Sequence, residues 1–364
     1  MDQRMSRRKS DYIFVPERNR RRGPGCLMLM LSVALLVVVL SALTNNAMNK
    51  KVKLLEEKIA IMSLDKTYEG LSILHLSDLN AARLGEDADA WRSLLFGKKF
   101  AAVVMSGDMV GESGDFTPLV ALIKLLRQQN AAAPLYFIAG DDDPPPVPTA
   151  VSVSSEPYAD WVRAAQQAGA IYLDAPVSQP LGKKTVWFTP EYLYGVDVAG
   201  MCESLARQRA EMEAAGKPYE AEGSASYRAL CCRLDAMERS AQAIKTMKEG
   251  DLQIAVTHTP LGVEYVRTLL EWTAEDTVFS YRRLHLVLAG HYAGGQWRLG
   301  ALGPLYVPDR GWLAGDEGVV GLQRVNAITQ YISGGLGASG FYPMPGRLFN
   351  APSCTLLTFT ARIR

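Results

Sequence analysis

Six side chains with metal-binding chemistry each follow a short apolar run in this sequence. Such runs are too short for a typical globular helix and indicate buried strands. In open α/β sheets ligands bind outside the carboxyl ends of the strands, so groups placed there are expected to meet. Carboxylate, amide and imidazole groups together have the ligand types of a divalent metal site. The six candidate ligands are Asp78, Asn80, Asp108, Asp141, His258 and His291.

The first half of the chain alternates between apolar runs and segments with helical spacing. Strands are predicted over residues 71–76, 101–105 and 135–139, with helices over residues 88–96 and 119–129 between them. This βαβ alternation predicts a parallel sheet. Because such crossovers are right-handed, the three acidic strand ends should lie along one edge.

The remaining elements complete an α/β domain over residues 52–364. Residues 201–248 are charged and Ala-rich and are predicted to form a helical insertion of two or three surface helices, whose methionines pack amphipathically. A helix is predicted over residues 158–168, and further strands within residues 52–61, 170–173, 185–189, 252–257, 285–289, 331–333 and 355–360.

Five sequence blocks resemble, in order, the signature blocks of the calcineurin-like metallophosphoesterases. They are LHLSDLN, VVMSGDMV, IAGDDD, VTHTP and LAGHYAGGQ, against the usual DxH, GD, GNH[ED], H and GHxH. The GGQ ending and the segments 297–307 and 331–337 are similar to a membrane-bound bacterial phosphodiesterase branch of that family. The resemblance covers residues 52–359 and implies a four-layer αββα sandwich with metals at the strand ends.

The resemblance also implies a role for each candidate ligand, and three positions depart from the family pattern. Asp108 would bridge two metals, one of which would also take Asp141, His258 and His291. The other would take Asp78 and Asn80, where an amide replaces the family imidazole, and position 293, where a methyl group does. The family His that contacts the phosphoryl oxygen or protonates the leaving group falls on Asp142, our weak candidate for a catalytic residue.

Two interpretations of the altered site follow, and both stay open at this point. In the first, metal-activated water hydrolyses a phosphodiester or phosphomonoester at an altered site that holds one metal ion or two. In the second, the domain is a catalytically inactive scaffold that binds a metal, a phosphate or a partner. The cofactor is one or two divalent ions, with Mn, Mg, Zn, Fe and Ca not distinguished. We place hydrolysis first because a nearly complete metal site is retained.

Residues 26–44 form a predicted transmembrane anchor behind a basic tail. Residues 1–25 carry eight Lys/Arg against three acidic residues, whereas residues 26–43 carry no charge. A helix of that length reaches roughly 27 Å, close to the hydrocarbon thickness. The basic excess places the tail in the cytoplasm and the domain outside. Because no convincing small-residue cleavage site follows, we favour a retained anchor over a cleaved signal peptide. Residues 45–51 are predicted as a short linker.

Composition limits the partners. With a formal net charge of +1 over 364 residues, nothing in the overall balance calls for nucleic acid. A domain held close to the bilayer makes a phosphate-containing small molecule or a lipid-linked phosphate the expected substrate. Two further histidines, His75 and His285, lie within or at the start of strands and are expected to be structural. The five cysteines show no metal-ligand spacing, and both disulfide pairing and free buried thiols stay open for the four outside the anchor.

Overall fold

The computed structural model describes residues 24–61, 64–148, 156–219, 221–272, 283–326, 328–340 and 342–361. The chain divides into two compact units, residues 1–44 and residues 45–364. The predicted basic tail, residues 1–25, lies almost wholly outside the described residues. The first unit consists of most of α1 (Pro24–Asn49). One window of this helix, Cys26–Asn49, is long and apolar enough to cross a membrane, a property that a signal sequence shares.

Helix α1 runs to Asn49, five residues into the segment predicted as a linker. The boundary differs because residues 44–49 (TNNAMN) lack proline, glycine and charge, so nothing local ends the helix where the apolar run stops. Residues 45–49 belong to the second unit and are hydrogen-bonded within it.

The first six-stranded sheet of the second unit carries three of the predicted acidic strand ends. Its strand order is β1-β15-β2-β3-β4-β5. Strands β2 to β5 are parallel, as the βαβ alternation predicts, whereas β15 runs antiparallel to β2 and parallel to β1. The strands are β1 (Lys53–Ala60), β2 (Ser72–Leu76), β3 (Ala102–Ser106), β4 (Leu135–Ile138), β5 (Ala170–Tyr172) and β15 (Ser353–Thr360).

The second six-stranded sheet carries the two predicted histidine ends. Its order is β13-β14-β9-β8-β7-β6, with the four central strands parallel and an antiparallel strand at each edge. The strands are β6 (Val177–Leu181), β7 (Lys184–Pro190), β8 (Leu252–Val256), β9 (Leu286–Ala289), β13 (Gly321–Val325) and β14 (Ile328–Ile332). A small antiparallel sheet holds β10 (Trp297–Arg298), β11 (Pro304–Val307) and β12 (Gly311–Trp312).

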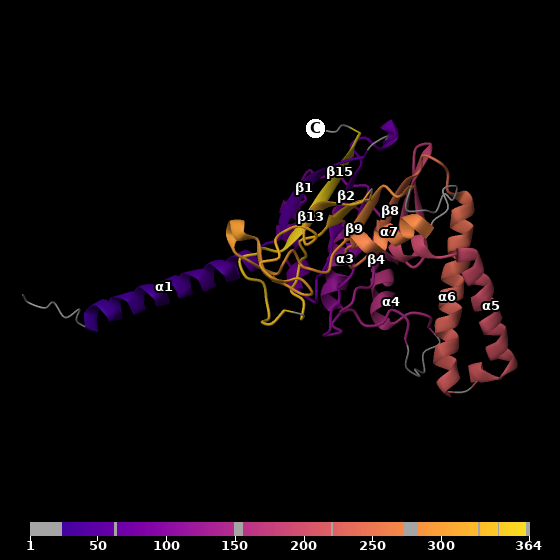
Figure 1. Cartoon of the computed structure of the whole chain (residues 1–364), viewed down its shortest axis with the longest axis horizontal. Coiled ribbons are helices and arrows are strands. Elements are labelled where there is room, and N and C mark those ends of the chain that lie inside the picture. Colours follow the sequence, from indigo (N-terminus) through magenta and orange to yellow (C-terminus); the bar gives the residue numbers. More distant parts are fainter. Residues whose placement is uncertain are drawn as a thin grey trace, which may run out of the picture. The chain divides into compact units, whose positions relative to one another are not determined.

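Alternation along the strands creates the layers of the second unit. In β3, Val104 points into a core that lies between the two sheets, whereas Val103 and Met105 point into a separate core under the helices. Successive strand residues face opposite sides of a sheet, so each sheet buries both faces. A third core covers the far face of the second sheet. The described part of the domain therefore has the four layers of an αββα sandwich, and the helices flank the sheets in Figure 1.

The outer layers consist of amphipathic helices. Helix α3 has proline in its first turn, where no backbone donor is needed, and buries Leu119, Leu122, Ile123 and Leu126 on one stripe. The helices on the first sheet are α2 (Ala88–Leu94), α3 (Thr117–Gln129) and α4 (Asp160–Gln167), and those on the second are α5 (Val198–Ala214), α6 (Ala221–Thr246) and α7 (Val263–Trp272).

The predicted insertion forms α5 and α6, which lie side by side in Figure 1. They are not only surface helices, because Leu205, Leu234 and Met237 are buried in the core on the second sheet. Their methionine packing agrees with the amphipathic interpretation. Helix α7 and strands β6, β12 and β13 were not among the predicted elements, whereas β10 and β11 lie in the segment 297–307, where the resemblance implies a single strand. The short strands β10 and β12, of two residues each, are too short for alternation to show in the sequence.

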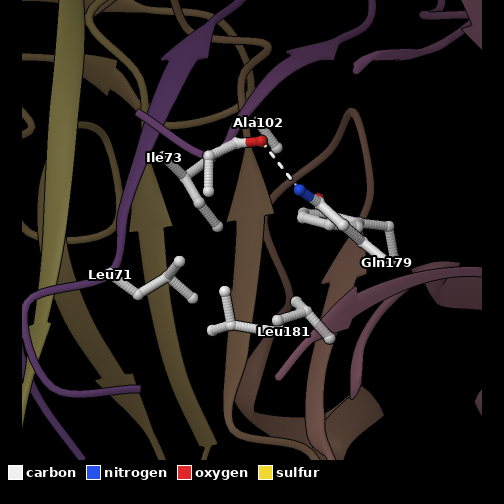
Figure 2. Close-up of a pocket in the computed structure, with 8 residues that line it drawn as sticks. Leu71, Ile73, Ala102, Gln179 and Leu181 are labelled. Atoms are coloured by element: carbon white, nitrogen blue, oxygen red, sulfur yellow. Dashed lines mark hydrogen bonds between the residues drawn. The ribbon is translucent and has the colours of Figure 1, made fainter. Parts of the chain in front are cut away.

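A small apolar cavity between the sheets, of about 10 Å³, is lined by Leu71, Ala101 and Phe188 among others (Figure 2). It lies where β2 and β3 begin, at the edge opposite the candidate ligands. Gln179 donates a 2.8 Å hydrogen bond to the carbonyl of Ala101 there. A space of about one water volume with apolar walls does not hold a ligand. It is a packing gap rather than a site.

Candidate functional site

The structure brings five of the six candidate ligands together at the carboxyl ends of the two sheets. Asp78, Asp108 and Asp141 follow β2, β3 and β4, and His258 and His291 follow β8 and β9. Their ligand atoms form two groups, each with all atoms within 4.8 Å of one another. The first group is Asp141, His258 and His291, and the second is Asp78, Asp108 and His258. His258 belongs to both groups and connects the two sheets at the site.

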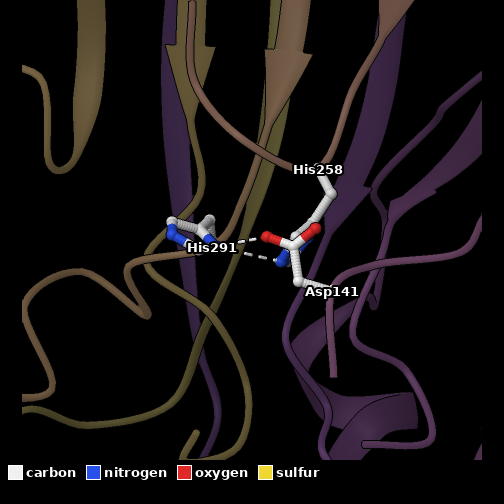
Figure 3. A group of neighbouring side chains, drawn as sticks. All are labelled: Asp141, His258 and His291. Atoms are coloured by element: carbon white, nitrogen blue, oxygen red, sulfur yellow. Dashed lines mark hydrogen bonds and ion pairs between the residues drawn. The ribbon is translucent and has the colours of Figure 1, made fainter. Parts of the chain in front are cut away.

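The first group is the more open of the two. His291 Nδ1 lies 3.3 Å from both Asp141 Oδ2 and His258 Nε2. Figure 3 shows the carboxylate of Asp141 and the two imidazoles directed toward a common point. Thr259 donates its hydroxyl to Asp141 Oδ2 at 3.3 Å. Because Asp141 is more than half exposed while His258 is buried, one side of this group faces solvent.

The second group is fully buried. Asp108 Oδ2 lies 3.0 Å from His258 Nε2, and the other ring nitrogen of His258 is bonded to the carbonyl of Ser106 at 2.9 Å. That bond orients the imidazole, in the way that metal-ligating histidines are usually held. Asp78 accepts the backbone N–H of His291 at 3.0 Å through Oδ1 and the Ser77 hydroxyl through Oδ2. The site therefore places carboxylates from β2 and β3 against an imidazole from β8.

The charges of the site demand a cation. Burial raises the pKa of Asp78 to about 6, with Asp108 adding like-charge repulsion. Burial alone would lower the pKa of His258, but its contact with Asp108 and the charge of Asp78 raise that pKa to about 10. A protonated His258 thus supplies the positive charge that the two buried carboxylates require. A divalent ion would supply that positive charge instead when His258 is neutral and acts as a ligand.

The loops that carry the ligands have strained backbones. Asp78, Asn80, Asp108 and His291 all have positive φ, between 47° and 78°, a region that few non-glycine residues adopt. Strained residues of this kind persist where the surrounding structure fixes them, and they cluster at functional sites. This feature was not visible from residue types alone.

Asp143 fixes the loop that follows β4. Its carboxylate accepts backbone N–H groups of Met109, Val110, Gly111 and Gly140, at 2.7 to 3.2 Å. It is buried and does not belong to either ligand group. Of the run Asp141 to Asp143, the first points to the histidines, the second accepts from Ser339, and the third holds the loop together.

The three positions that depart from the family pattern lie beside the second group. Ala293 is fully buried, and a Cβ on Gly335 would lie 3.2 Å from the Cβ atoms of both Ala293 and Asp78. Asn80 packs its side-chain oxygen against Gly111, and its amide nitrogen is buried without a hydrogen-bond partner. Asn80 is the one candidate ligand outside the two groups, which consist of Asp and His side chains only.

Asp142 turns away from the histidines. Its Oδ2 accepts the Ser339 hydroxyl at 3.0 Å, while its backbone N–H donates to Asp108 Oδ1 at 2.8 Å. Desolvation, followed by the charge of Asp108, raises the pKa of its carboxyl group. A carboxyl group with a raised pKa holds its proton longer as pH rises, so this residue has proton-donor chemistry without the cationic charge of the family histidine.

The residues present fit a divalent metal. Asp108 Oδ2 is buried without a hydrogen-bond partner, although it lies 3.0 Å from His258 Nε2. An unpaired buried carboxylate oxygen is costly, and coordination of an ion would satisfy it. Carboxylate and imidazole donors together suit Zn, Fe, Mn and related ions. Asp108 and His258 would hold the ion, with Asp141 and His291 on one side and Asp78 on the other.

Replacing Gly140 with Ala is expected to weaken metal binding by on the order of 10- to 100-fold, as disturbed outer contacts of metal ligands do. A Cβ on Gly140 would lie 2.1 Å from Asp108 Oδ1 and 2.3 Å from Asp108 N, so that carboxylate must move. Isothermal titration with Mn²⁺ measures the loss. Gly262→Ala is the matched control, since a Cβ there meets nothing within 4 Å. Equal affinities for the two variants would contradict the placement of Asp108.

A cavity of about 300 Å³ adjoins the first ligand group. It is lined by Asp141 and His258 and, on the far side, by Glu191, Tyr192 and Asp174. Glu191 is buried, and its Oε1 has no hydrogen-bond partner. Burial raises the pKa of Glu191 to about 7, and a hydrogen bond from Tyr265 opposes that rise. Glu191 was not among the predicted site residues, because an isolated Glu after a strand (β7) gives no spacing that marks it.

Replacing Glu191 with Gln is expected to raise stability at neutral pH but not at acidic pH. The folded pKa lies above the unfolded value, so the unfolded state loses its proton first and stability falls as pH rises from about 4.5 to about 7. The loss amounts to about 3 kcal/mol at most, since one pKa unit is about 1.4 kcal/mol. Thermal unfolding of both proteins from pH 4.5 to 8 measures it, with exposed Glu57→Gln as control. A stability difference that stays constant with pH would refute this account of Glu191.

The histidines and cysteines outside the site behave structurally. Burial lowers the pKa of His75 to about 3, so this ring is neutral, and its Nε2 pairs with the Ser106 hydroxyl at 2.8 Å. His285 accepts the backbone N–H of Gln253. All five cysteines are free thiols, with Cys354 buried in the first sheet. The free-thiol alternative therefore describes this structure.

Comparison with known proteins adds little. No protein family matches this sequence, and no curated protein matches it. Among solved structures, phosphopantetheinyl hydrolase from Mycobacterium tuberculosis is similar over 74% of this chain and 91% of its own, at 12% identity and a TM-score of 0.35. A similarity at that TM-score supports no inference about activity, and the functional case rests on the residues of this chain.

Proposed function

We propose that the domain is a metal-dependent phosphoester hydrolase, anchored to a membrane by α1. The main support is that two groups of aspartate and histidine side chains, with His258 common to both, meet at the carboxyl ends of strands from both sheets. The order of the five sequence blocks, with their resemblance to metallophosphoesterases, supports the same chemistry. The substrate would be a phosphodiester or a phosphomonoester.

The roles of the residues follow from their contacts. Asp108 and His258 would hold a divalent ion, and the Ser106 carbonyl keeps His258 oriented. A divalent ion at this place would polarise a phosphoryl oxygen and lower the pKa of a bound water. His291 and Asp141 complete the open side, where the adjoining cavity admits a substrate. The resemblance assigns the proton donor for the leaving oxygen to position 142, and the pKa of Asp142 is shifted in the direction that such a role needs.

The binding scaffold is the second candidate, and one feature of the second group favours it. Both oxygens of Asp78 are already hydrogen-bonded, to the His291 backbone and the Ser77 hydroxyl, and the neighbouring position is the methyl group of Ala293. A second ion would have to displace these bonds without help from an imidazole at position 293. A single-metal site that binds phosphate without turning it over fits this geometry.

A generic aryl phosphodiester separates the two candidates. The full chain in detergent is assayed with added Mn²⁺, Mg²⁺, Zn²⁺ or Ca²⁺, beside His258→Ala, which removes the residue that both ligand groups share. The exposed control is Asp89→Asn, on the surface of α2. Metal-dependent turnover that His258→Ala abolishes and Asp89→Asn preserves supports hydrolysis. Absence of turnover with all four ions, while the chain binds one of them, would overturn hydrolysis in favour of the scaffold.

A further inference from the structure

Several large apolar side chains are exposed on the small sheet of β10, β11 and β12, on its turns and at Met344, besides single exposed ones elsewhere on the second unit. Trp312 is 69% exposed and Leu313 64%, at the end of β12. Leu302 is 65% exposed, Leu299 47% and Met344 59%. The first four belong to the small sheet of β10, β11 and β12 and its connecting turns. Single exposed apolar residues are ordinary, but a group of this kind that includes Trp marks an interaction surface.

The small sheet is hydrogen-bonded to a loop, residues 346–349, that is itself hydrogen-bonded to Asn45 near the end of α1. Arg298 N donates to the carbonyl of Leu348 at 2.9 Å, and Leu348 N donates to the carbonyl of Gln296 at 3.1 Å. In the same loop, the backbone N–H of Phe349 donates to the side chain of Asn45 at 2.7 Å. One loop, residues 346–349, therefore joins the small sheet to Asn45.

Asn45 and Asn49 both donate side-chain hydrogen bonds to the carbonyl of Arg347, each at 2.9 Å. Asn45 follows Leu43, the end of the predicted uncharged apolar run of residues 26–43, by two positions, or about 3 Å along a helix. If residues 26–43 cross a bilayer, chain connectivity alone puts Asn45 at its surface. The loop bonded to Asn45, and the small sheet bonded to that loop, then lie in the same interfacial zone.

The lysines that follow α1 suit anionic headgroups. Lys50, Lys51 and Lys53 follow the end of α1 directly, and all three are exposed. Lysines next to a membrane span are attracted to anionic lipid, and Trp side chains prefer the boundary between hydrocarbon and water. A second copy of the chain would need no such charge pattern.

The same surface is connected to the candidate metal site. Trp312 contacts Tyr306 with 5.3 Å between ring centroids, and Tyr306 contacts Tyr342 at 6.0 Å. The Tyr342 hydroxyl donates to the carbonyl of Tyr292, the residue after His291. Arg347 is buried and donates its guanidinium to the carbonyls of Gly334 and Gly337, in the segment that packs on Asp78.

We propose that Leu299, Leu302, Trp312, Leu313 and Met344 form a membrane-contact surface that inserts into the bilayer spanned by α1 and holds the site against it. This inference rests on the proposed function for the anchor and for the chemistry. It deepens that function by naming the substrate class: a phosphoester carried by a membrane lipid, reached at the headgroup level. A soluble phosphoester would gain nothing from this placement.

Fluorescence quenching tests the surface without any need for activity. The full chain is reconstituted in phosphatidylcholine and phosphatidylglycerol vesicles whose acyl chains are either plain or brominated. The difference between the parent and Trp312→Phe isolates the emission of Trp312. We expect brominated chains to remove most of that emission. As control, Phe96→Trp in the Trp312→Phe protein places Trp at a site that is 84% exposed after α2, toward the strand starts, and its emission should persist.

The other outcomes overturn the proposal. If Trp312 escapes brominated lipid but is quenched by aqueous iodide, the surface faces water. If neither quencher reaches it, protein covers it, either a second copy or a partner. In both cases the membrane-contact surface is wrong, whatever the enzyme does.

An activity comparison tests the substrate class separately. The doubly substituted Trp312→Asp/Leu313→Asp protein is compared with the parent on two aryl phosphodiesters, one soluble and one carrying a long acyl chain in the vesicle. We expect turnover of the acylated substrate to fall at least about tenfold, which is 1.4 kcal/mol, with turnover of the soluble one unchanged. Equal losses on both substrates would contradict a lipid substrate. If the parent turns over neither, hydrolysis fails while the quenching result still decides the surface.

Discussion

The Asp108→Asn protein is expected to bind divalent metal at least about 100-fold more weakly than the parent and to lose any metal-dependent hydrolysis. Even residues that only hydrogen-bond to a metal ligand contribute about 10- to 100-fold to metal affinity, so the loss of a ligand should cost at least as much. Asp108 Oδ2 is a buried oxygen without a hydrogen-bond partner, and it lies 3.0 Å from His258 Nε2. The substitution replaces that anionic oxygen with a neutral amide of the same shape. Isothermal titration with Mn²⁺ and Zn²⁺ measures the affinity.

The fold should survive the change at Asp108. An Asn oxygen still accepts the backbone N–H of Asp142, which Asp108 Oδ1 now does at 2.8 Å. Removing one of two buried carboxylates relieves the repulsion with Asp78, which offsets part of the lost ion pair with His258, so the metal-free variant should stay folded. Unchanged metal affinity in a folded variant would show that Asp108 is not a ligand. Asp89→Asn, on the exposed face of α2, is the matched control.

The variant Asn80→His/Asp142→His/Ala293→His is expected to bind a second ion and to hydrolyse an aryl phosphodiester faster than the parent by about 10²–10⁴, the usual contribution of a general acid. It places imidazoles where the resemblance expects them. Ala293 adjoins Asp78 across Gly335, so a ligand at 293 approaches the second group. Bound metal per chain and turnover are measured together.

The control for this variant is Asn80→Gln/Asp142→Gln/Ala293→Gln, which adds side chains of similar length without imidazole. If both variants fold and neither gains metal or rate, the three substitutions are not what limits the site. A gain in metal without a gain in rate would show that neither the second ion nor the proton donor at position 142 limits turnover. A rate that rises in the glutamine variant as well would contradict a role for the imidazoles.

The arrangement of the site was predictable because it depends on topology. The strands before Asp78, Asp108 and Asp141 are largely apolar runs with helices between them. Because these strands pair in parallel, their carboxyl ends lie along one edge of the sheet. His258 and His291 follow the same logic in the second sheet. The meeting of all these strand ends was predicted from the residues, but their division into two facing sheets was implied only by the resemblance, since periodicity does not say which sheets face each other.

The details of the site depend on contacts that leave no pattern in the sequence. Asp141, Asp142 and Asp143 are identical in type, yet they face the histidines, Ser339 and the backbone of the neighbouring loop. Glu191 acquires its raised pKa from burial that no spacing indicates. The docking of Asn45 on Arg347 joins residues 302 positions apart, and the predicted linker therefore continues as helix. Strand β12, of two residues, was missed because alternation does not show over so short a length.

The most direct test of the central claim is the number of metal ions bound per chain. The full protein in detergent is equilibrated with Mn²⁺, Zn²⁺, Mg²⁺ or Ca²⁺, and unbound ions are removed by gel filtration. Bound metal is then measured by elemental mass spectrometry for the parent, His258→Ala and His75→Ala. We predict one ion per chain in the parent and in His75→Ala, with none in His258→Ala, since His258 alone belongs to both ligand groups. A parent that binds none of the four ions, or a His258→Ala protein that binds as many as the parent, would contradict the metal site.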